Sequence, residues 1–299
     1  MIMASSTPLK ALRKEAKTQL SDNFSRALAV LCVSLMFSAV FMMIDQTFNS
    51  FLNTDTSFLI LSESQGNEDS LMVDLLGFIG ATILNPSFLI AAIISIFNFL
   101  ITAPLKMGTG WWYYSLAANG NLQVGNIFAF YKTNSYYTAS IMFEIKLFLK
   151  KLVYAIASFA PSLVALVMAF ERDGSEYTLK PDSEGETIIM ISLVLAAAGI
   201  IFYVFLSLNF FLSRYLFAIG ECEKADEAFD RSKVIMHGDK STVVQMAMSL
   251  IGWYLLCVLI IPLGYVIPLH NACMARCARD IIEKHKKYEA SDQHKFVEL

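Results

Sequence analysis

Long apolar runs without a charged side chain dominate the pattern along the chain. Five of them stand out: 27–44, 87–105, 152–170, 187–213 and 242–261. A helix needs about 20 mostly apolar residues to cross the hydrocarbon core of a bilayer. The runs therefore predict transmembrane helices, and we expect an all-α fold, a polytopic membrane helical bundle.

A sixth span is predicted over 263–282, but its apolar run is short. Only 263–275 is free of charge before Arg276, about 20 Å of helix against a hydrocarbon core of about 30 Å. Either Arg276 and Arg279 reach toward the interface, or neighbouring helices shelter this helix. A five-span alternative would put the basic C-terminal tail outside the cell, so we expect six spans.

Three polar segments between the apolar runs carry apolar residues at helical spacing: 8–22, 124–133 and 224–237. In the first, Leu12 and Leu20 share one face while basic residues occupy the other. Such helices lie in the membrane interface and are attracted by anionic lipids. We expect the bilayer's anionic inner leaflet to be a partner of all three. For the first segment, a merely polar amphipathic tail is the alternative.

A break in the helical pattern follows each of these segments, at Asn23, Asn134 and Gly238. Two predicted spans follow each break, which suggests a threefold parallel repeat about an axis along the membrane normal. The alternative is that any six-span chain starting inside the cell contains three hairpins by construction.

Charge is distributed unevenly between the segments that join the spans. Of the 23 Lys and Arg residues, only Arg172 and Lys180 lie in the two acidic segments 45–86 and 171–186. Cytoplasmic loops carry an excess of Lys and Arg. We therefore predict that the acidic segments are external, that both termini are cytoplasmic, and that the protein spans the cytoplasmic membrane of a bacterium.

The composition supports a membrane protein with a single domain, residues 1–299. The chain is 56% hydrophobic and 16% charged, and its mean hydropathy is +0.54. A soluble domain carries about 25% charged residues. The net charge of −3 gives no reason to expect a nucleic-acid partner. Five cysteines, none in a predicted external loop, do not favour a disulfide framework.

No phosphate-binding glycine loop, paired-histidine zinc motif or nucleophile elbow occurs in the sequence. We therefore expect no enzyme activity and no cofactor. One metal site was considered: His270, Cys273 and Cys277 recur at i, i+3 and i+7, and imidazole and thiolate are zinc ligands. Apolar packing of the cysteines is favoured over this site.

Polar residues within the predicted spans are the candidates for function. Ionisable side chains deep in a membrane are functional candidates by default, and the middles of the first five spans contain none. The candidates for the bundle interior are Asn98, Asn209, Arg214, His270, Asn271 and Arg276. In one interpretation these residues line a path for a solute. In the favoured interpretation they form hydrogen bonds between helices, and each such bond contributes about 0.6 kcal/mol on average.

Several short motifs occur in an order and spacing found in a known family. They are Pro104 with Gly108, Arg214-Tyr215, Glu227-Ala228, Ser232, Met236, Gly238 and Leu250-Ile251-Gly252-Trp253. With the basic N-terminal helix, they make the chain resemble the bacterial integral membrane proteins called Domain of Unknown Function 975 (DUF975). The resemblance implies a six-span bacterial membrane protein, distantly similar to the membrane domain attached to some glycerophosphodiester phosphodiesterases. It brings no established activity and no functional residues.

Three hypotheses for function follow. The first is a non-enzymatic accessory or scaffold protein that works with a membrane protein partner in a transport or envelope system. The second is a transporter or channel for a lipid or a small neutral solute. The third is a membrane-embedded enzyme, which would need a polar cluster that only the fold assembles. The sequence leaves the partner, the substrate and the oligomeric state open.

Overall fold

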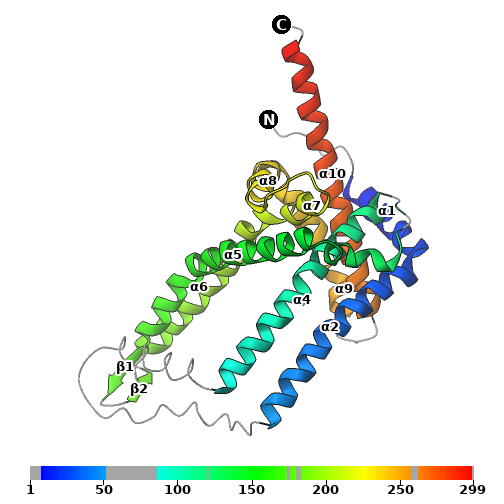
Figure 1. Ribbon diagram of the computed structural model, residues 1–299. Helices are drawn as coiled ribbons and strands as arrows, with labels where there is room; N and C mark the ends of the chain where they lie inside the picture. The colour runs from blue at the N-terminus through cyan, green and yellow to red at the C-terminus, as the bar shows by residue number, and fades with distance from the viewer. Residues whose placement is uncertain are drawn as a thin grey trace. The chain divides into compact units, whose positions relative to one another are not determined.

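The computed structural model describes residues 8–51, 86–118, 120, 122–173, 176–179, 183–256 and 262–297. These residues are helical apart from one short β-hairpin and the connecting turns (Figure 1). The chain forms two compact units. The first unit comprises Met1–Ser34, Ala103–Pro161 and Leu195–Leu299, and the second comprises Leu35–Thr102 and Ser162–Val194.

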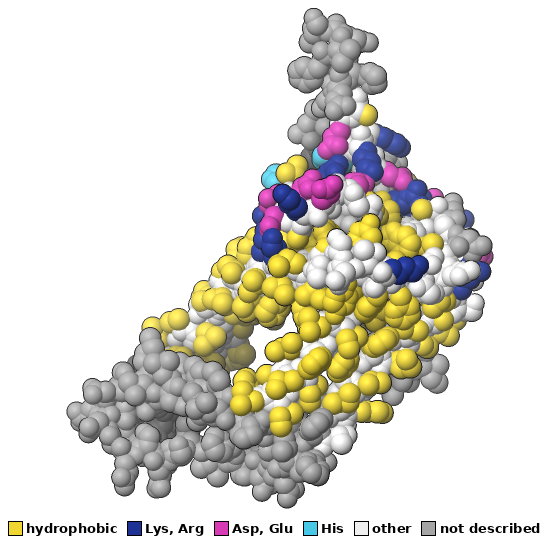
Figure 2. Space-filling model, in the orientation of Figure 1, with side chains coloured by type: hydrophobic (Ala, Val, Ile, Leu, Met, Phe, Trp, Pro, Cys, Tyr) yellow, Lys and Arg dark blue, Asp and Glu magenta, His cyan; other side chains and the backbone are white. Residues whose placement is uncertain are grey.

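Four helices among the described residues are long and apolar enough to cross a membrane: Phe24–Ile44, Phe88–Ala117, Asn134–Met168 and Gly185–Ala218. They belong to α2 (Phe24–Phe51), α4 (Pro86–Ala117), α5 (Asn134–Met168), and α6 (Ser183–Ser207) with the short segments that follow it. Many of their large apolar side chains are exposed, such as Ile201 (72%) and Val194 (67%). Figure 2 shows hydrophobic side chains covering these helices. A surface of this kind is stable in lipid and not in water.

In the first unit, helix α10 (Leu263–Val297) packs against α1 (Leu9–Asp22) and α8 (Ala225–Met248), as Figure 1 shows. The apolar stripe of α1 is fully buried at Leu12 and Leu20. Cys273 and Cys277 of α10 are also fully buried. The apolar stripe of α1 thus packs against protein. Contact of this helix with the anionic inner leaflet remains a prediction.

An aromatic cluster joins α8 to α5 and to the end of the α6 segment. The ring of Phe143 lies 5.0 Å from that of Phe229 and 4.9 Å from that of Phe217, centroid to centroid. Phe217 belongs to α7 (Ser213–Ala218), and η3 (Leu208–Phe210) contributes Phe210 at 5.6 Å from Phe229. Aromatic pairs at these separations add to the stability gained from burial alone.

Helix η2 (Val124–Tyr131), a 3₁₀ helix, lies against α4 at Gly108. A side-chain Cβ at Gly108 would be 1.8 Å from the carbonyl oxygen of Ile127, so only glycine permits this approach. Gly199 of α6 likewise lies close to α5: a Cβ at this position would be 2.6 Å from the carbonyl oxygen of Ser158. The small size of Gly199 therefore allows α6 to pack closely against α5.

The second unit contains one β-hairpin and the parts of α2, α4, α5 and α6 that fall within Leu35–Thr102 and Ser162–Val194. Strand β1 (Phe170–Asp173) pairs antiparallel with β2 (Glu176–Leu179), with Phe170 opposite Leu179. In the same unit, the Ser192 hydroxyl donates a hydrogen bond to the carbonyl of Ser162 at 3.1 Å. The segment predicted as the external loop 171–186 thus contains the hairpin and the start of α6. Most of the predicted loop 45–86 lies outside the described residues, although α2 continues to Phe51.

Three helices extend beyond the segments that the sequence pattern delimited. Helix α4 does not end at residue 105 but passes Pro104 and continues to Ala117. Helix α5 begins at Asn134 and includes the basic residues that were placed before the span 152–170. Helix α8 runs through Gly238 without a break, so the predicted breaks do not recur three times. A glycine costs only about 1 kcal/mol in a helix interior. A proline is tolerated in a membrane helix where neighbouring groups satisfy the backbone groups that it frees.

The last two predicted spans are not among the four apolar helices found in the described residues. The segment 242–261 is divided: α8 ends at Met248, α9 covers Ile251–Leu256, and residues 257–261 lie outside the described residues. The segment 263–282 forms the first part of α10, which continues as one helix to Val297.

Candidate functional site

Among the predicted site residues, Arg214 on α7 forms a two-bond pair with a carboxylate. Its Nε donates a hydrogen bond to Oε1 of Glu144 at 3.0 Å, and its Nη2 donates one to Oε2 at 3.1 Å. The Glu144 side chain, on α5, is only 9% exposed. A fork of two parallel charge-assisted bonds is the strong form of an Arg–carboxylate pair. It fixes α7 to α5 at the end of the apolar segment 187–213.

Arg276, on α10, joins three helices. Its Nη2 lies 2.6 Å from Oε2 of Glu15 on α1, and its Nη1 donates to the carbonyl oxygen of Ala117 at 2.8 Å. The side-chain amide of Gln19 reaches the same carbonyl at 3.4 Å. Ala117 is the last residue of α4, where carbonyls lack helical partners and the helix dipole is negative. Arg276 therefore caps α4 while it holds α1 in place.

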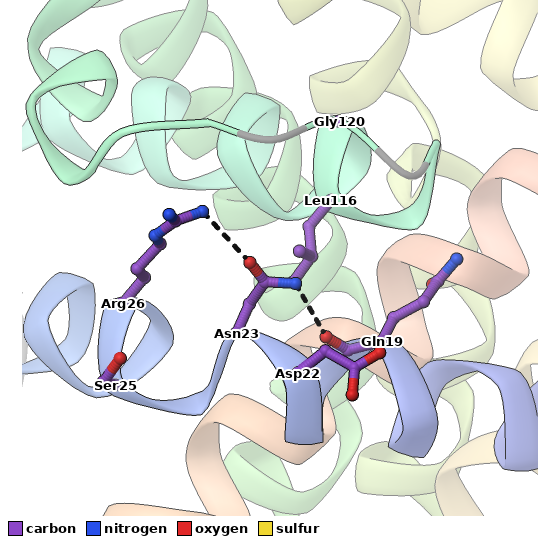
Figure 3. A pocket seen from close by; sticks show the side chains of 7 residues that line it. All are labelled: Gln19, Asp22, Asn23, Ser25, Arg26, Leu116 and Gly120. Carbon is purple, nitrogen blue, oxygen red and sulfur yellow. Dashed lines mark hydrogen bonds between the residues drawn. The ribbon is translucent and has the colours of Figure 1, made fainter.

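Two open cavities lie along α1. One, of about 500 Å³, is lined by Gln19, Asp22, Asn23, Ser25, Arg26, Leu116 and Gly120 (Figure 3). The other, of about 630 Å³, is lined by Ala11, Lys14, Glu15, Thr18, Gln19 and Arg276. Figure 3 shows Arg26 and Asn23 extending toward the segment that carries Gly120. Arg26 Nη1 donates to Asn23 Oδ1 at 3.2 Å, and Asn23 Nδ2 donates to the Gln19 carbonyl at 3.2 Å. These polar groups bond to one another at the junction of α1 and α2.

Charged side chains also connect α8 and α10. Lys284 Nζ lies 2.8 Å from Oδ1 of Asp239, and both side chains are about 15% exposed. Glu221, 14% exposed, pairs with Arg231 at 3.4 Å and with Lys286. Gly220 positions Glu221: its φ of 76° ends α7 in the left-handed region that glycine adopts at low cost. Figure 2 shows Lys, Arg, Asp and Glu side chains gathered around α8 and α10.

Asp226, at the start of α8, is bound from α5. Lys146 Nζ lies 2.5 Å from one of its carboxylate oxygens, and Lys150 Nζ lies 3.7 Å from the other. The hydrogen bond from Lys146 lowers the pKa of Asp226 below its usual range. Nearby, burial raises the pKa of the Cys222 thiol. A thiol with a raised pKa is a poor nucleophile at neutral pH.

The remaining predicted site residues make separate local contacts. The Tyr254 hydroxyl and His270 Nδ1 are 2.6 Å apart. Asn271 is half-buried on the same helix as His270. Asn209 accepts a hydrogen bond at its backbone carbonyl from the buried Ser232, at 2.7 Å. Asn98 belongs to the second unit, and its side-chain oxygen is buried without a hydrogen-bond partner among the described residues. Within the described part of the first unit, the predicted residues are thus dispersed over several contacts.

Within the described ranges, no three His, Cys, Asp or Glu side chains converge to hold a metal ion. The alternative metal site therefore has no assembled ligand set there. His270 instead contacts Tyr254, and Cys273 and Cys277 are packed in the core around α10.

Sequence analysis missed two carboxylates that complete the arginine pairs, Glu144 and Glu15. The sequence offers a weak indication of each: an acidic residue stands in a segment that is otherwise rich in basic residues. Glu144 stands two residues before Lys146, and Glu15 lies between Lys14 and Lys17. An acid kept inside a basic amphipathic segment is a candidate partner for an arginine elsewhere in the fold.

Comparison with known proteins gives one result. The family model described as "Protein of unknown function (DUF975)" matches residues 3–277. No curated protein and no solved structure matches the chain.

Proposed function

We propose a function from the premise that this chain belongs to the DUF975 family of proteins of unknown function. The protein is a non-enzymatic accessory or scaffold component of a transport or envelope system. Its apolar helices hold it in the membrane, and the α1–α8–α10 body presents a docking surface to a membrane protein partner on the cytoplasmic side.

One observation carries this proposal: the charged groups of the body bind the helices to one another. Arg276 joins α10 to α1 and α4, Lys284 joins α10 to α8, and Arg214 joins α7 to α5. Charges committed to such pairs make a rigid platform. Helix α10 continues to Val297, and its side chains at Lys287, Tyr288 and Ala290 are exposed. A rigid base with an exposed helical extension suits docking.

Site-specific photocrosslinking in native membranes tests the proposal. A photoreactive residue replaces Tyr288, which is 42% exposed on α10, or Val194, which is 67% exposed on the apolar helix α6. We expect a crosslink to one protein species from position 288 and only lipid adducts from position 194. The crosslinked protein should remain bound, in fixed stoichiometry, when gently extracted protein is weighed by native mass spectrometry. A protein that is alone in both experiments contradicts the accessory role.

A second function, a transporter or channel for a lipid or a small neutral solute, is favoured by Asn98. Its side-chain oxygen is buried in α4 without a hydrogen-bond partner among the described residues. A buried unpaired amide oxygen is costly unless something else bonds to it. If it lines a solute path, Asn98→Leu abolishes glycerol flux into vesicles that contain the protein. The control is Ser95→Leu, at an exposed position on the same helix. Equal flux in the two variants rules out a role for Asn98.

A further inference from the structure

Three basic residues stand directly at the ends of three predicted spans. Lys106 follows the uncharged run 87–105, Lys151 precedes 152–170, and Arg214 follows 187–213. A cation at the end of an apolar run lies at the level of the lipid headgroups, also where the helix itself continues past it, as α4 and α5 do. The sequence therefore places all three cations at one membrane depth.

The structure brings these three cations together. The Cδ of Arg214 would lie 3.6 Å from a Cβ at Gly110, so the arginine stem crosses α4 at that residue. Lys106 precedes Gly110 by four residues and shares its helix face. Glu144 precedes Lys151 by seven residues, two turns of α5, and also shares a face with it. The charged groups that act most strongly on Lys151 are Arg214, Glu144 and Lys106.

The charges in this cluster do not balance. Glu144 is its only described carboxylate, and it is occupied by Nε and Nη2 of Arg214. Lys106 and the half-buried Lys151 have neither an ion pair nor a hydrogen bond within the described ranges. By contrast, Lys146 and Lys150 on another face of α5 both pair with Asp226. A partly buried cation without a partner is costly, and a bound anion would offset that cost.

We propose that Lys106, Lys151 and Arg214 form a binding site for the phosphate of an anionic phospholipid headgroup. Two features identify the ligand as a lipid. The cluster has a surplus of positive charge that fits a phosphate group, and it stands at the ends of apolar segments, where a headgroup lies while its acyl chains contact the helices. Lys106 and Lys151 neutralise the phosphate. Arg214, held in place by Glu144, contributes its Nη1 donors, which have no partner among the described residues.

The test measures lipid retention by native mass spectrometry. The purified protein is titrated in detergent with phosphatidylglycerol or with zwitterionic phosphatidylcholine. The variants are Lys151→Gln and Lys106→Gln, which remove no described ion pair. The matched control is Lys146→Gln, which makes the same charge change on α5 but on the face that meets Asp226. Thermal unfolding of each variant verifies that it is folded.

We expect tighter retention of phosphatidylglycerol than of phosphatidylcholine by the wild type. Each of Lys151→Gln and Lys106→Gln should weaken phosphatidylglycerol binding about fivefold, the effect of one basic residue near an anionic surface. Lys146→Gln should leave it unchanged. Equal retention of the two lipids, or equal loss in Lys151→Gln and Lys146→Gln, overturns the proposal. Displacement of the lipid by millimolar inorganic phosphate would show that the site takes a soluble anion and would overturn the lipid assignment.

Discussion

At the scale of single residues, glycines decide how closely the segments of the first unit approach. Gly108 and Gly238 are both motif residues in the sequence, but their surroundings differ completely. The site of a Cβ at Gly108 is occupied by the backbone of Ile127, whereas no atom of the described residues lies within 4 Å of the corresponding site at Gly238. Sequence alone could not separate the two, because the difference lies in a contact between segments far apart in the chain.

Gly108→Ala should destabilise the protein by about 1–3 kcal/mol, the usual cost of overpacking. The new methyl group would meet the Ile127 carbonyl oxygen at 1.8 Å, and backbone atoms cannot rotate out of the way as a side chain can. The control is Gly125→Ala on η2, where nothing lies within 4 Å. Thermal unfolding of the two variants in the same detergent measures the difference. Equal melting temperatures would contradict the close approach of η2 to α4.

Gly238→Ala should instead stabilise the protein, by about 0.5–1 kcal/mol, because alanine is favoured over glycine in a helix interior. This prediction depends on the continuity of α8 through residue 238. Gly220→Ala serves as the contrast and should destabilise, because residue 220 has a φ of 76°. Destabilisation by Gly238→Ala would restore the break that the sequence pattern indicated.

At the scale of elements, helical spacing predicted the helices but not the surfaces that they cover. Leu12, Ala16 and Leu20 correctly predicted the amphipathic helix α1, yet an apolar stripe looks the same whether it faces lipid or protein. What distinguishes the two here is Arg276, 261 positions after Glu15, which pairs with it. Periodicity carries no information about such a partner.

Arg276→Gln should destabilise the protein by about 1–3 kcal/mol, because a charged hydrogen bond to the Ala117 carbonyl is lost with the ion pair. Glu15→Gln leaves the bond to Ala117 and should cost only about 0.2–1 kcal/mol. Lys233→Gln, which breaks an exposed pair with Asp230, is the control and should have little effect. The temperature of the unfolding midpoint should fall most in Arg276→Gln, less in Glu15→Gln and least in Lys233→Gln. A larger loss in Glu15→Gln than in Arg276→Gln would refute the capping role.

The contact between α5 and α8 should depend on pH through Asp226. Its pKa in the folded state is lowered by Lys146, below the value of about 3.9 in an unfolded chain. The stabilisation of the folded protein by the Asp226–Lys146 pair is therefore present above about pH 4. It is lost as the pH falls through the lower pKa that Asp226 has in the folded state. The difference in stability between the wild type and Asp226→Asn should be constant from pH 7 to about pH 5 and should shrink below about pH 4. Thermal melts across this range measure it, and a difference that does not vary with pH argues against the pair.

At the scale of the whole molecule, the four apolar helices are the part that sequence predicts best. Their existence follows from the length of the apolar runs and the thickness of the bilayer. Their ends were harder to predict, because Pro104 and the lysines of α5 are held inside helices by contacts with η2, α7 and α8. The pairing of Arg214 with Glu144 was beyond sequence analysis for the same reason, since 70 residues separate them.

Six spans with both termini in the cytoplasm remain our prediction for the topology. Reporters at the termini cannot distinguish six spans from four, because any even number of spans places both termini on the same side of the membrane. Position 262, between α9 and α10, distinguishes them, because six spans place it outside the cell and four leave it inside. We expect a cysteine at Pro262, in a chain without other cysteines, to react with a membrane-impermeant maleimide in intact cells. A cysteine at Ser64 should react in the same way, and one at Tyr288 only after lysis. Protection of position 262 would reduce the number of spans to the four apolar helices and leave α8, α9 and α10 in the cytoplasm.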